Sequence, residues 1–438
     1  MSEAMIARLD TTQSDFEAQF SALLVSPFES DAGLTQKVAD ILRSVASEGD
    51  DAVVKFTNEF DQRNAHNLAD LTIQQEALDA ALVTISPGLR DALAHAAERI
   101  RDFHQRQLAE SWQYDDGEGN LLGQRVSPLD RVGVYVPGGR ASYPSSVLMN
   151  TIPAKVAGVA DIVMVAPAPH GEINPVVLAA ASLAGVNKVY SVGGAQAIAA
   201  LAYGTETIAK VDKIVGPGNR FVAEAKRQVF GRVGIDMVAG PSEILIIADG
   251  TVDPEWVTMD LFAQAEHDEY AQAILISPDQ AYLDEVHACI DRKLPEMSRR
   301  DIISVSLRHR GALVAVPNLT AAVTLSNRLA PEHLELAVAE PHALLDQISA
   351  AGAIFMGAMS SESLGDYCAG PNHVLPTSGS ARFASPLGVY DFQRRSSLIG
   401  ISESGARLLG KVASKIADAE SLEAHSLSAQ MRMPNRIE

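Results

Sequence analysis

The stretch Val211-Asp-Lys-Ile-Val-Gly-Pro-Gly-Asn219 is an apolar run that ends in glycine and leads into a helix-like segment over 220–230. Similar runs occur in the same region, with alanine-rich, helix-like segments over 174–184 and 195–203 between them. These runs are Arg131–Val136 before Pro137-Gly138-Gly139, Lys188–Val192 before Gly193-Gly194-Ala-Gln196, and Gly234–Val238 before Gly240-Pro-Ser242-Glu243. Strands that alternate with helices form parallel sheets, so the pattern predicts an α/β sheet over about 131–240.

Glycines at the ends of these strands predict a ligand site. Ligands of parallel sheets bind at the carboxyl ends of the strands, where glycine lets the backbone approach them. Helix N-termini beyond such loops suit anionic phosphates. The chain contains neither Gly-x-Gly-x-x-Gly nor Gly-x-x-x-x-Gly-Lys-Ser/Thr. The pattern therefore indicates a phosphorylated cofactor without identifying it, and the alternative that Gly216–Asn219 is a simple turn stays open.

A second set of apolar runs predicts a second α/β unit over about 241–385. The runs are Ile244–Ala248, Ala273–Ile276 and Gly311–Val316, separated by helix-like segments over 254–267 and 279–294. Residues 33–107 are helical in pattern and have no strands of their own, so we expect them to pack on this second unit.

The predicted fold class is therefore α/β, with two Rossmann-like parallel-sheet domains, one inserted in the other, and small helical segments at both ends. The expected divisions are an N-terminal arm (1–30), a discontinuous α/β domain (31–130 and 241–387), an inserted α/β domain (131–240) and a C-terminal helical segment (388–438).

Composition narrows the class of protein. A chain of 438 residues suggests two or three domains, and a net charge of −20 at pH 7 disfavours nucleic acid or an anionic membrane as a partner. Its 2 cysteines, Cys289 and Cys368, allow no disulfide framework and fit a reducing compartment. The apolar runs are too short to span a bilayer, and the N-terminus has no targeting pattern. We expect a cytoplasmic protein.

Side chains that can hold a metal or move a proton occur in three separate segments. They are Gln264 and His267, three residues apart on one face of a predicted helix; Glu332 and His333, an acid beside a base; and Asp366 and His373, in a glycine-containing loop. Such residues are usually solvated or hydrogen-bonded within their own loop or helix. Their joint occurrence with the glycine-ended strands favours a site with an N/O metal shell.

Six blocks in one order resemble the histidinol dehydrogenase family, and the resemblance spans nearly the whole chain. They are Gly-Pro-Gly-Asn-Arg (216–220), Gly-Ile-Asp-Met-Val-Ala-Gly-Pro-Ser-Glu (234–243), Ala-Gln-Ala-Glu-His-Asp (263–268), Asn-Arg-Leu-Ala-Pro-Glu-His-Leu-Glu (327–335), Ser-Leu-Gly-Asp-Tyr (363–367) and Asn-His-Val-Leu-Pro-Thr (372–377). The resemblance implies a zinc- and NAD-dependent enzyme of histidine biosynthesis. Such an enzyme oxidises L-histidinol to histidinaldehyde and then to L-histidine, with two NAD and one water.

The resemblance also implies roles for residues and domains. It implies the metal ligands Gln264, His267, Asp366 and His425; the catalytic pair Glu332 and His333; the NAD contacts Tyr135, Gln196 and Asn219; and the substrate contacts Ser242, Gln264, His267, His333, Asp366, His373, Glu420 and His425. The inserted domain would bind NAD, and the discontinuous domain would bind substrate and one zinc ion per subunit. A homodimer is implied, in which the C-terminal segment of one subunit completes the other's site. From the residues alone, His425 could equally fold back on its own chain.

Within this reading, His333 accepts the alcohol proton and Glu332 activates water for the second oxidation. A thiol route through Cys368 is the rival mechanism, which the nearby charge of Asp366 disfavours. Three other functions remain open. A zinc hydrolase would leave the glycine-ended strands unused, and a non-enzymatic sensor of NAD or metal would not need the Glu332–His333 pair. A related zinc-dependent dehydrogenase of another amino alcohol or polyol is the main alternative.

Overall fold

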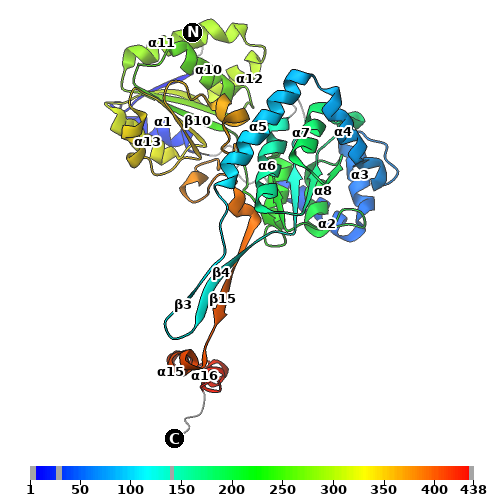
Figure 1. Cartoon of the computed structure of the whole chain (residues 1–438). Coiled ribbons are helices and arrows are strands. Elements are labelled where there is room, and N and C mark those ends of the chain that lie inside the picture. Colours follow the sequence, from blue (N-terminus) through cyan, green and yellow to red (C-terminus); the bar gives the residue numbers. More distant parts are fainter. Residues whose placement is uncertain (1–5, 26–31, 139–142, 434–438) are drawn as a thin grey trace.

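The computed structural model describes residues 6–25, 32–138 and 143–433. Within these ranges the chain forms two six-stranded sheets and a three-stranded ribbon that carries two helices at its far end (Figure 1). The predicted α/β class with two mainly parallel sheets is confirmed. Parts of the expected N-terminal arm (1–5 and 26–30) and Gly139 lie outside the described residues. No described helix combines the length and apolar character that a membrane span requires.

The first sheet contains the glycine-ended runs. Its strands lie in the order β2 (Thr72–Ile73), β7 (Lys188–Tyr190), β6 (Asp161–Val165), β5 (Arg131–Tyr135), β8 (Lys213–Val215) and β9 (Gly234–Ile235), and only the β2–β7 pair is antiparallel. The helices between the strands are α6 (Pro144–Ala157), α7 (Pro175–Ala184), α8 (Gly194–Tyr203) and α9 (Arg220–Val229). The chain runs outward from β5 to β7 and then returns to β8 on the other side of β5. This reversal is the switch point at which such sheets bind ligands.

Four N-terminal helices also pack on the first sheet. They are α2 (Ala32–Glu48), α3 (Asp50–Phe60), α4 (Gln75–Thr84) and α5 (Pro87–Gln105). Helices α2 and α3 contact α8, while α4 contacts α7 and α5 contacts α6, so their apolar faces complete the cores on the two sides of this sheet. The sequence predicts these helices on the second unit, and that prediction is wrong. Strand β2 ties the segment to β7, but two residues are too few to be recognised as a strand.

The second sheet is entirely parallel. Its strands lie in the order β1 (Ala7–Asp10), β12 (Gly311–Ala315), β11 (Gln272–Ser277), β10 (Glu243–Ala248), β13 (His333–Ala337) and β14 (Ala353–Met356). The helices on its faces are α1 (Phe16–Leu23), α10 (Pro254–Ala265), α11 (Gln280–Lys293), α12 (Arg300–Arg310) and α13 (Leu319–Leu329). Because β1 and α1 come from the expected N-terminal arm, the first unit is inserted between α1 and β10. An insertion is observed, but it begins about a hundred residues before the predicted boundary.

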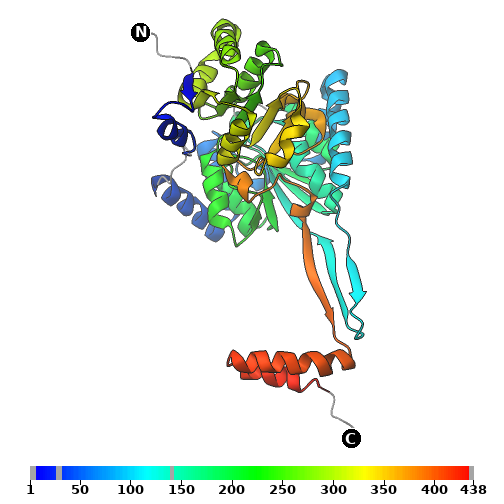
Figure 2. The ribbon, with the colours of Figure 1, turned by 90° about the vertical axis from the view of Figure 1, so that its left-hand side faces the viewer.

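The ribbon consists of β3 (Trp112–Asp115), β4 (Leu121–Pro128) and β15 (Gln393–Gly400), paired antiparallel. It extends away from the two sheets and ends in α15 (Glu403–Ala419) and α16 (Glu423–Gln430), here called the terminal helix pair (Figures 1 and 2). The sequence predicts a helical segment over 388–438, which is wrong for β15. Pairing of its backbone with β4, rather than a buried apolar face, forms this exposed strand, so no apolar alternation marks it.

Candidate active site

The predicted metal and proton-transfer residues other than His425 converge at the amino ends of β10 and β13. His333 is the first residue of β13. Gln264 lies at the end of α10, and His267 follows that helix. Asp366 lies in a π-helical turn. One atom each from His333, Glu362 and Asp366 forms a group in which all atoms lie within 4.8 Å of one another, a spacing that fits a metal ion.

The amide of Gln264 lies between His267 and Glu362. One of its two terminal atoms is 3.4 Å from His267 Nδ1. The other is 3.2 Å from both Glu362 Oε1 and His333 Nδ1. The amide nitrogen faces Glu362 in the orientation that satisfies the neighbours, because a carboxylate only accepts hydrogen bonds. The amide oxygen then faces His267, so the two residues lie close together and could offer an oxygen and a nitrogen to a metal.

His333 is held in one orientation by the neighbouring strand. Its Nδ1 lies 2.9 Å from the backbone oxygen of Glu243, so Nδ1 carries the hydrogen and donates. Its Nε2 lies 3.5 Å from Asp366 Oδ1 and makes no hydrogen bond within the described ranges. Glu332 Oε2 accepts a hydrogen bond of 2.8 Å from Glu243 N and lies 3.8 Å from His333 Nδ1. The imidazole therefore turns Nε2 toward the ligand cluster.

Buried carboxyl groups surround His333. Burial raises the pKa of Glu332 and of Glu362 to about 8 in each case, although the charge of His333 opposes this. Burial by itself lowers the pKa of His333, but Glu362, Glu332 and Asp366 raise it well above its usual value. Glu362 Oε2 is buried and, like His333 Nε2, has no partner among the described residues. Unpartnered buried groups are costly, so this cluster fits a cation that supplies both a partner and positive charge.

His373 and Ser242 lie beside this cluster. His373 Nδ1 is 2.9 Å from the backbone oxygen of Asp366, and its Nε2 is 3.5 Å from Ser146 Oγ of α6. Burial lowers the pKa of His373, although the charge of Asp366 opposes this. Ser242 directly precedes β10, and its backbone oxygen accepts a hydrogen bond from Gln272 N. Both predicted substrate contacts therefore lie at the same sheet edge as the ligand cluster.

Glu420 and His425 do not join the site within one chain. Glu420 directly follows α15, and His425 lies in α16. The terminal helix pair stands at the end of the ribbon, away from the two sheets (Figures 1 and 2). As far as residue 433, where the described chain ends, the C-terminal segment does not fold back onto its own ligand cluster (Figure 1).

Sequence reasoning assigned no role to several buried acids of the site. Glu362 lies four residues before Asp366, and this spacing on a helical turn could have revealed it. Glu335 lies two residues after His333, and alternate strand residues share a face. Burial raises the pKa of Glu335 to about 9 and that of its neighbour Asp260 to about 6. The acidic cluster thus extends from the ligand residues to α10.

The predicted NAD contacts lie at the carboxyl edge of the first sheet. Tyr135 ends β5, and its hydroxyl accepts a 3.2 Å hydrogen bond from Gly194 N. Burial raises the pKa of Tyr135 to about 12, which keeps its O–H as a donor. Gln196 is buried in α8, and its Oε1 has no partner in the described part of the chain. Asn219 caps α9 by accepting from Phe221 N.

A buried ion pair fixes the loop that carries Asn219. Lys226 and Asp236 form this pair with side chains almost fully buried. Lys226 Nζ donates to Gly216 O at 2.9 Å, and Asp236 Oδ2 accepts from Gly216 N at 2.8 Å. Gly216 has a φ of 109°, and a Cβ there would lie 2.0 Å from Tyr135 O. The loop therefore requires glycine at position 216, and the buried ion pair holds both the N–H and the C=O of that residue.

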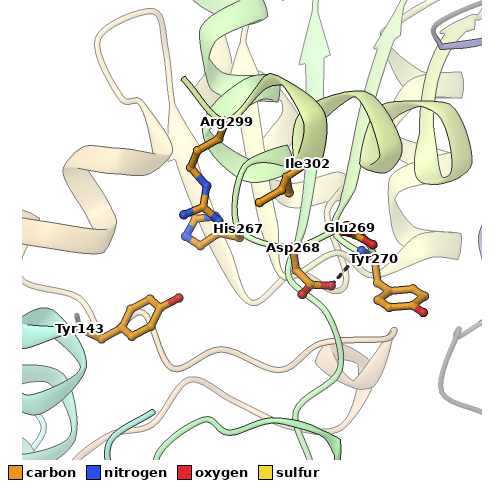
Figure 3. A pocket seen from close by; sticks show the side chains of 7 residues that line it. All are labelled: Tyr143, His267, Asp268, Glu269, Tyr270, Arg299 and Ile302. Carbon is orange, nitrogen blue, oxygen red and sulfur yellow. Dashed lines mark hydrogen bonds between the residues drawn. The ribbon is translucent and has the colours of Figure 1, made fainter. Parts of the chain in front are cut away.

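A cavity of about 380 Å³ opens beside His267. Its lining residues are Tyr143, His267, Asp268, Glu269, Tyr270, Arg299 and Ile302. Tyr143 directly precedes α6 of the first unit and lies across from His267 and Arg299 of the second unit (Figure 3). The metal-ligand side of the site is thus open toward the first unit.

A family model described as histidinol dehydrogenase matches residues 26–433. The chain is 59% identical over 428 residues to a histidinol dehydrogenase of Pseudomonas syringae pv. syringae (strain B728a), covering 98% of this chain and 96% of that protein. It is 60% identical over 426 residues to one of Chromobacterium violaceum, covering 97% and 98%. A crystal structure of histidinol dehydrogenase from Elizabethkingia anophelis matches with a TM-score of 0.93 and 34% identity over 99% of each chain. The chain belongs to the histidinol dehydrogenase family.

Membership of the histidinol dehydrogenase family confirms the resemblance seen in the sequence. It makes the chain an NAD-dependent oxidoreductase of histidine biosynthesis that acts on histidinol. The family match and the ligand cluster together indicate a dehydrogenase that uses a metal as well as NAD.

Replacing Lys226 by Met should lower the free energy of unfolding by about 3–5 kcal/mol, because the change leaves the buried carboxylate of Asp236 without its cation. The double variant Lys226→Met/Asp236→Asn should lose less, since the amide is neutral and still accepts a backbone hydrogen bond. Denaturant titration of both variants measures the difference. Equal losses would contradict a charge-based clamp.

Proposed function

We propose that the chain oxidises L-histidinol to L-histidine through histidinaldehyde, consuming two NAD and one water, with one zinc ion per subunit. The observation that supports this most is the convergence of buried Gln264 and His333, half-buried Asp366 and exposed His267 beside the first unit. Mixing zinc-loaded protein with NAD and histidinol should produce NADH, followed by its absorbance. Absence of NADH under these conditions would refute the proposal.

The donor set supports zinc. Gln264 and Asp366 offer oxygen atoms, and His267 offers an imidazole nitrogen; zinc accepts such ligands in a tetrahedral arrangement. When bound, zinc would anchor the nitrogen atoms of histidinol and offset the negative charge that favours protonated His333. Ser242 and His373 flank the ligand cluster, and we assign both side chains to substrate contact.

We infer a homodimer in which each subunit completes the other's site. Three of the four proposed zinc ligands, Gln264, His267 and Asp366, lie in the second unit. The fourth, His425, lies with Glu420 on the terminal helix pair, away from the two sheets (Figure 2). That pair exposes Leu408, Val412 and Ile416, an apolar stripe of the kind that marks protein interfaces. A two-fold exchange of ribbons would bury both stripes and deliver both histidines.

Proton transfer is assigned to Glu332 and His333. His333 donates from Nδ1 to Glu243 O, so Nε2 is the nitrogen left to take the hydroxyl proton while hydride passes to the nicotinamide. The second oxidation needs the hydrated aldehyde. We assign activation of that water to Glu332, whose raised pKa suits a group that takes and returns a proton near neutral pH.

The two cysteines support this mechanism and a cytoplasmic location. Cys289 and Cys368 are both free thiols, which suits a reducing compartment. Cys368 packs against the apolar core of the first unit, and its backbone oxygen accepts from Arg99. The thiol is only half-buried, and the nearby charge of Asp366 disfavours a thiol route, so the thiohemiacetal mechanism is not favoured.

Changing Glu332 to Gln should slow oxidation of supplied histidinaldehyde by about 10²–10⁴-fold, the usual effect of a general base, while slowing the alcohol step by less than about tenfold. Single-turnover NADH formation from each substrate separates the two steps. Equal losses would show that Glu332 does not serve the second step in particular.

Mixing two inactive variants tests the shared site. His267→Asn removes a proposed zinc ligand of the second unit, and His425→Asn removes the one on the terminal helix pair. A mixed dimer should therefore regain one intact site and its zinc ion. Zinc content and NADH formation after co-refolding measure the recovery. His342→Asn, at an exposed position, is the matched control and should remain active alone. If no activity returns on mixing, each site is built from a single chain.

A further inference from the structure

The first sheet places one position where dinucleotide-binding sheets carry an acid. Taking β5 as the first strand, β6 is the second and β7 the third in the order 3-2-1-4-5. In dinucleotide folds with this arrangement, a carboxylate near the end of the second strand accepts hydrogen bonds from the adenosine ribose. Strand β6 is followed by Ala166-Pro-Ala-Pro-His170, which contains no acid. The carboxylate must come from another part of the chain.

The segment after α3 supplies it. Asp61 directly follows α3, and its backbone oxygen accepts a 3.1 Å hydrogen bond from His170 N. Arg63 Nη1 donates to Ala168 O at 3.4 Å and to Ser191 Oγ at 3.3 Å. Ala168 and Ser191 follow β6 and β7, respectively. The Asp61–Arg63 segment therefore lies across the carboxyl ends of the second and third strands.

Asp61 offers an acceptor that lacks a donor. Its Oδ2 is buried and has no hydrogen-bond partner among residues 6–25, 32–138 and 143–433. Burial raises the pKa of Asp61, and the charge of Arg63 only partly offsets this. Asp61 lies near enough to Tyr135 for its charge to contribute to the raised pKa of that phenol. Gln196 Oε1, at the start of α8, is likewise buried without a partner in these ranges.

Two unpartnered acceptors at one sheet edge suit a ligand rich in hydroxyl donors. We propose that Asp61 binds the adenosine ribose hydroxyls of the dinucleotide and thereby selects NAD over NADP. A half-buried carboxylate would repel a 2′-phosphate and could receive no hydrogen bond from it. This inference rests on the proposed use of NAD and deepens it by naming the residue that sets the cofactor preference.

Arg63 predicts what happens when the acid is neutralised. Its guanidinium lies at the same strand ends, and an arginine there is the group that accommodates a 2′-phosphate in NADP-binding sheets. The variant Asp61→Asn removes the repulsion and leaves Arg63 available. The double variant Asp61→Asn/Arg63→Met removes both effects.

Titration of the zinc-loaded protein with NADH or NADPH, followed by nucleotide fluorescence, tests the assignment without any substrate. The original chain should prefer NADH. In Asp61→Asn the NADH affinity should fall and the NADPH/NADH affinity ratio should rise by about tenfold or more, the effect of one charged hydrogen bond. The double variant should lose the gain for NADPH. The control Asp51→Asn makes the same charge change at an exposed position of α3 and should alter neither affinity.

An equal fall in both affinities, or no change in either, would overturn the assignment. Asp61→Glu keeps the charge, so it should retain the preference for NADH even if Asp61→Asn proves too unstable to purify; loss of preference in Asp61→Glu with intact folding would count against the proposal. Failure of the original chain to oxidise histidinol would instead contradict the proposed function. The nucleotide titrations are read independently of that reaction.

Discussion

One residue, Glu243, orients both members of the proposed proton-transfer pair through its two backbone polar groups. The backbone nitrogen of Glu243 donates to the carboxylate of Glu332, and its backbone oxygen accepts from Nδ1 of His333. This arrangement depends on the parallel register of β10 and β13, in which Ile244 lies opposite His333. A slip of one residue would turn the imidazole to the other face of the sheet and remove Nε2 from Asp366. The apolar side chains of β10 (residues 244–247) and of Leu334 and Leu336 in β13 are fully buried, which makes such a slip costly.

One loop joins this register to the first unit. Asn372 donates to the backbone oxygen of Met149 in α6 at 2.7 Å, and His373 reaches Ser146 in the same helix. A few residues on, Ser378 N donates to Glu243 Oε1 at 3.0 Å. The loop therefore contacts α6 of the first unit and the first residue of β10. Hydride transfer requires a fixed distance between nicotinamide and substrate, and this loop restricts how the two units can move.

The sequence predicted those parts of the molecule whose burial leaves a periodic pattern. Continuous apolar runs, which end in glycine in the first unit, revealed both sheets, and short motifs singled out Gln264, His267 and His333 as candidates. The packing of α2–α5 was missed, because it depends on a two-residue edge strand and on shapes of helix surfaces. Glu362 was missed, although its spacing of four residues from Asp366 on a helical turn could have revealed it. Asp61 comes from a segment about a hundred residues before the strand end it contacts, a proximity that only the tertiary structure creates.

The proposed role of His425 would couple assembly to catalysis. Helix α15 packs closely on α16 through small residues, since a Cβ at Gly410 would lie 3.2 Å from Ala429 O. The pair is thus a compact unit whose larger apolar side chains face outward. With a net charge of −20, two copies repel each other at long range, so in the proposed dimer burial of this stripe, rather than charge attraction, would drive association. The contacts that bury it would also bring the last nitrogen ligand to the metal. Zinc that binds only the completed site would then stabilise the dimer by mass action, and dilution that separates the subunits would release the metal and stop the reaction together.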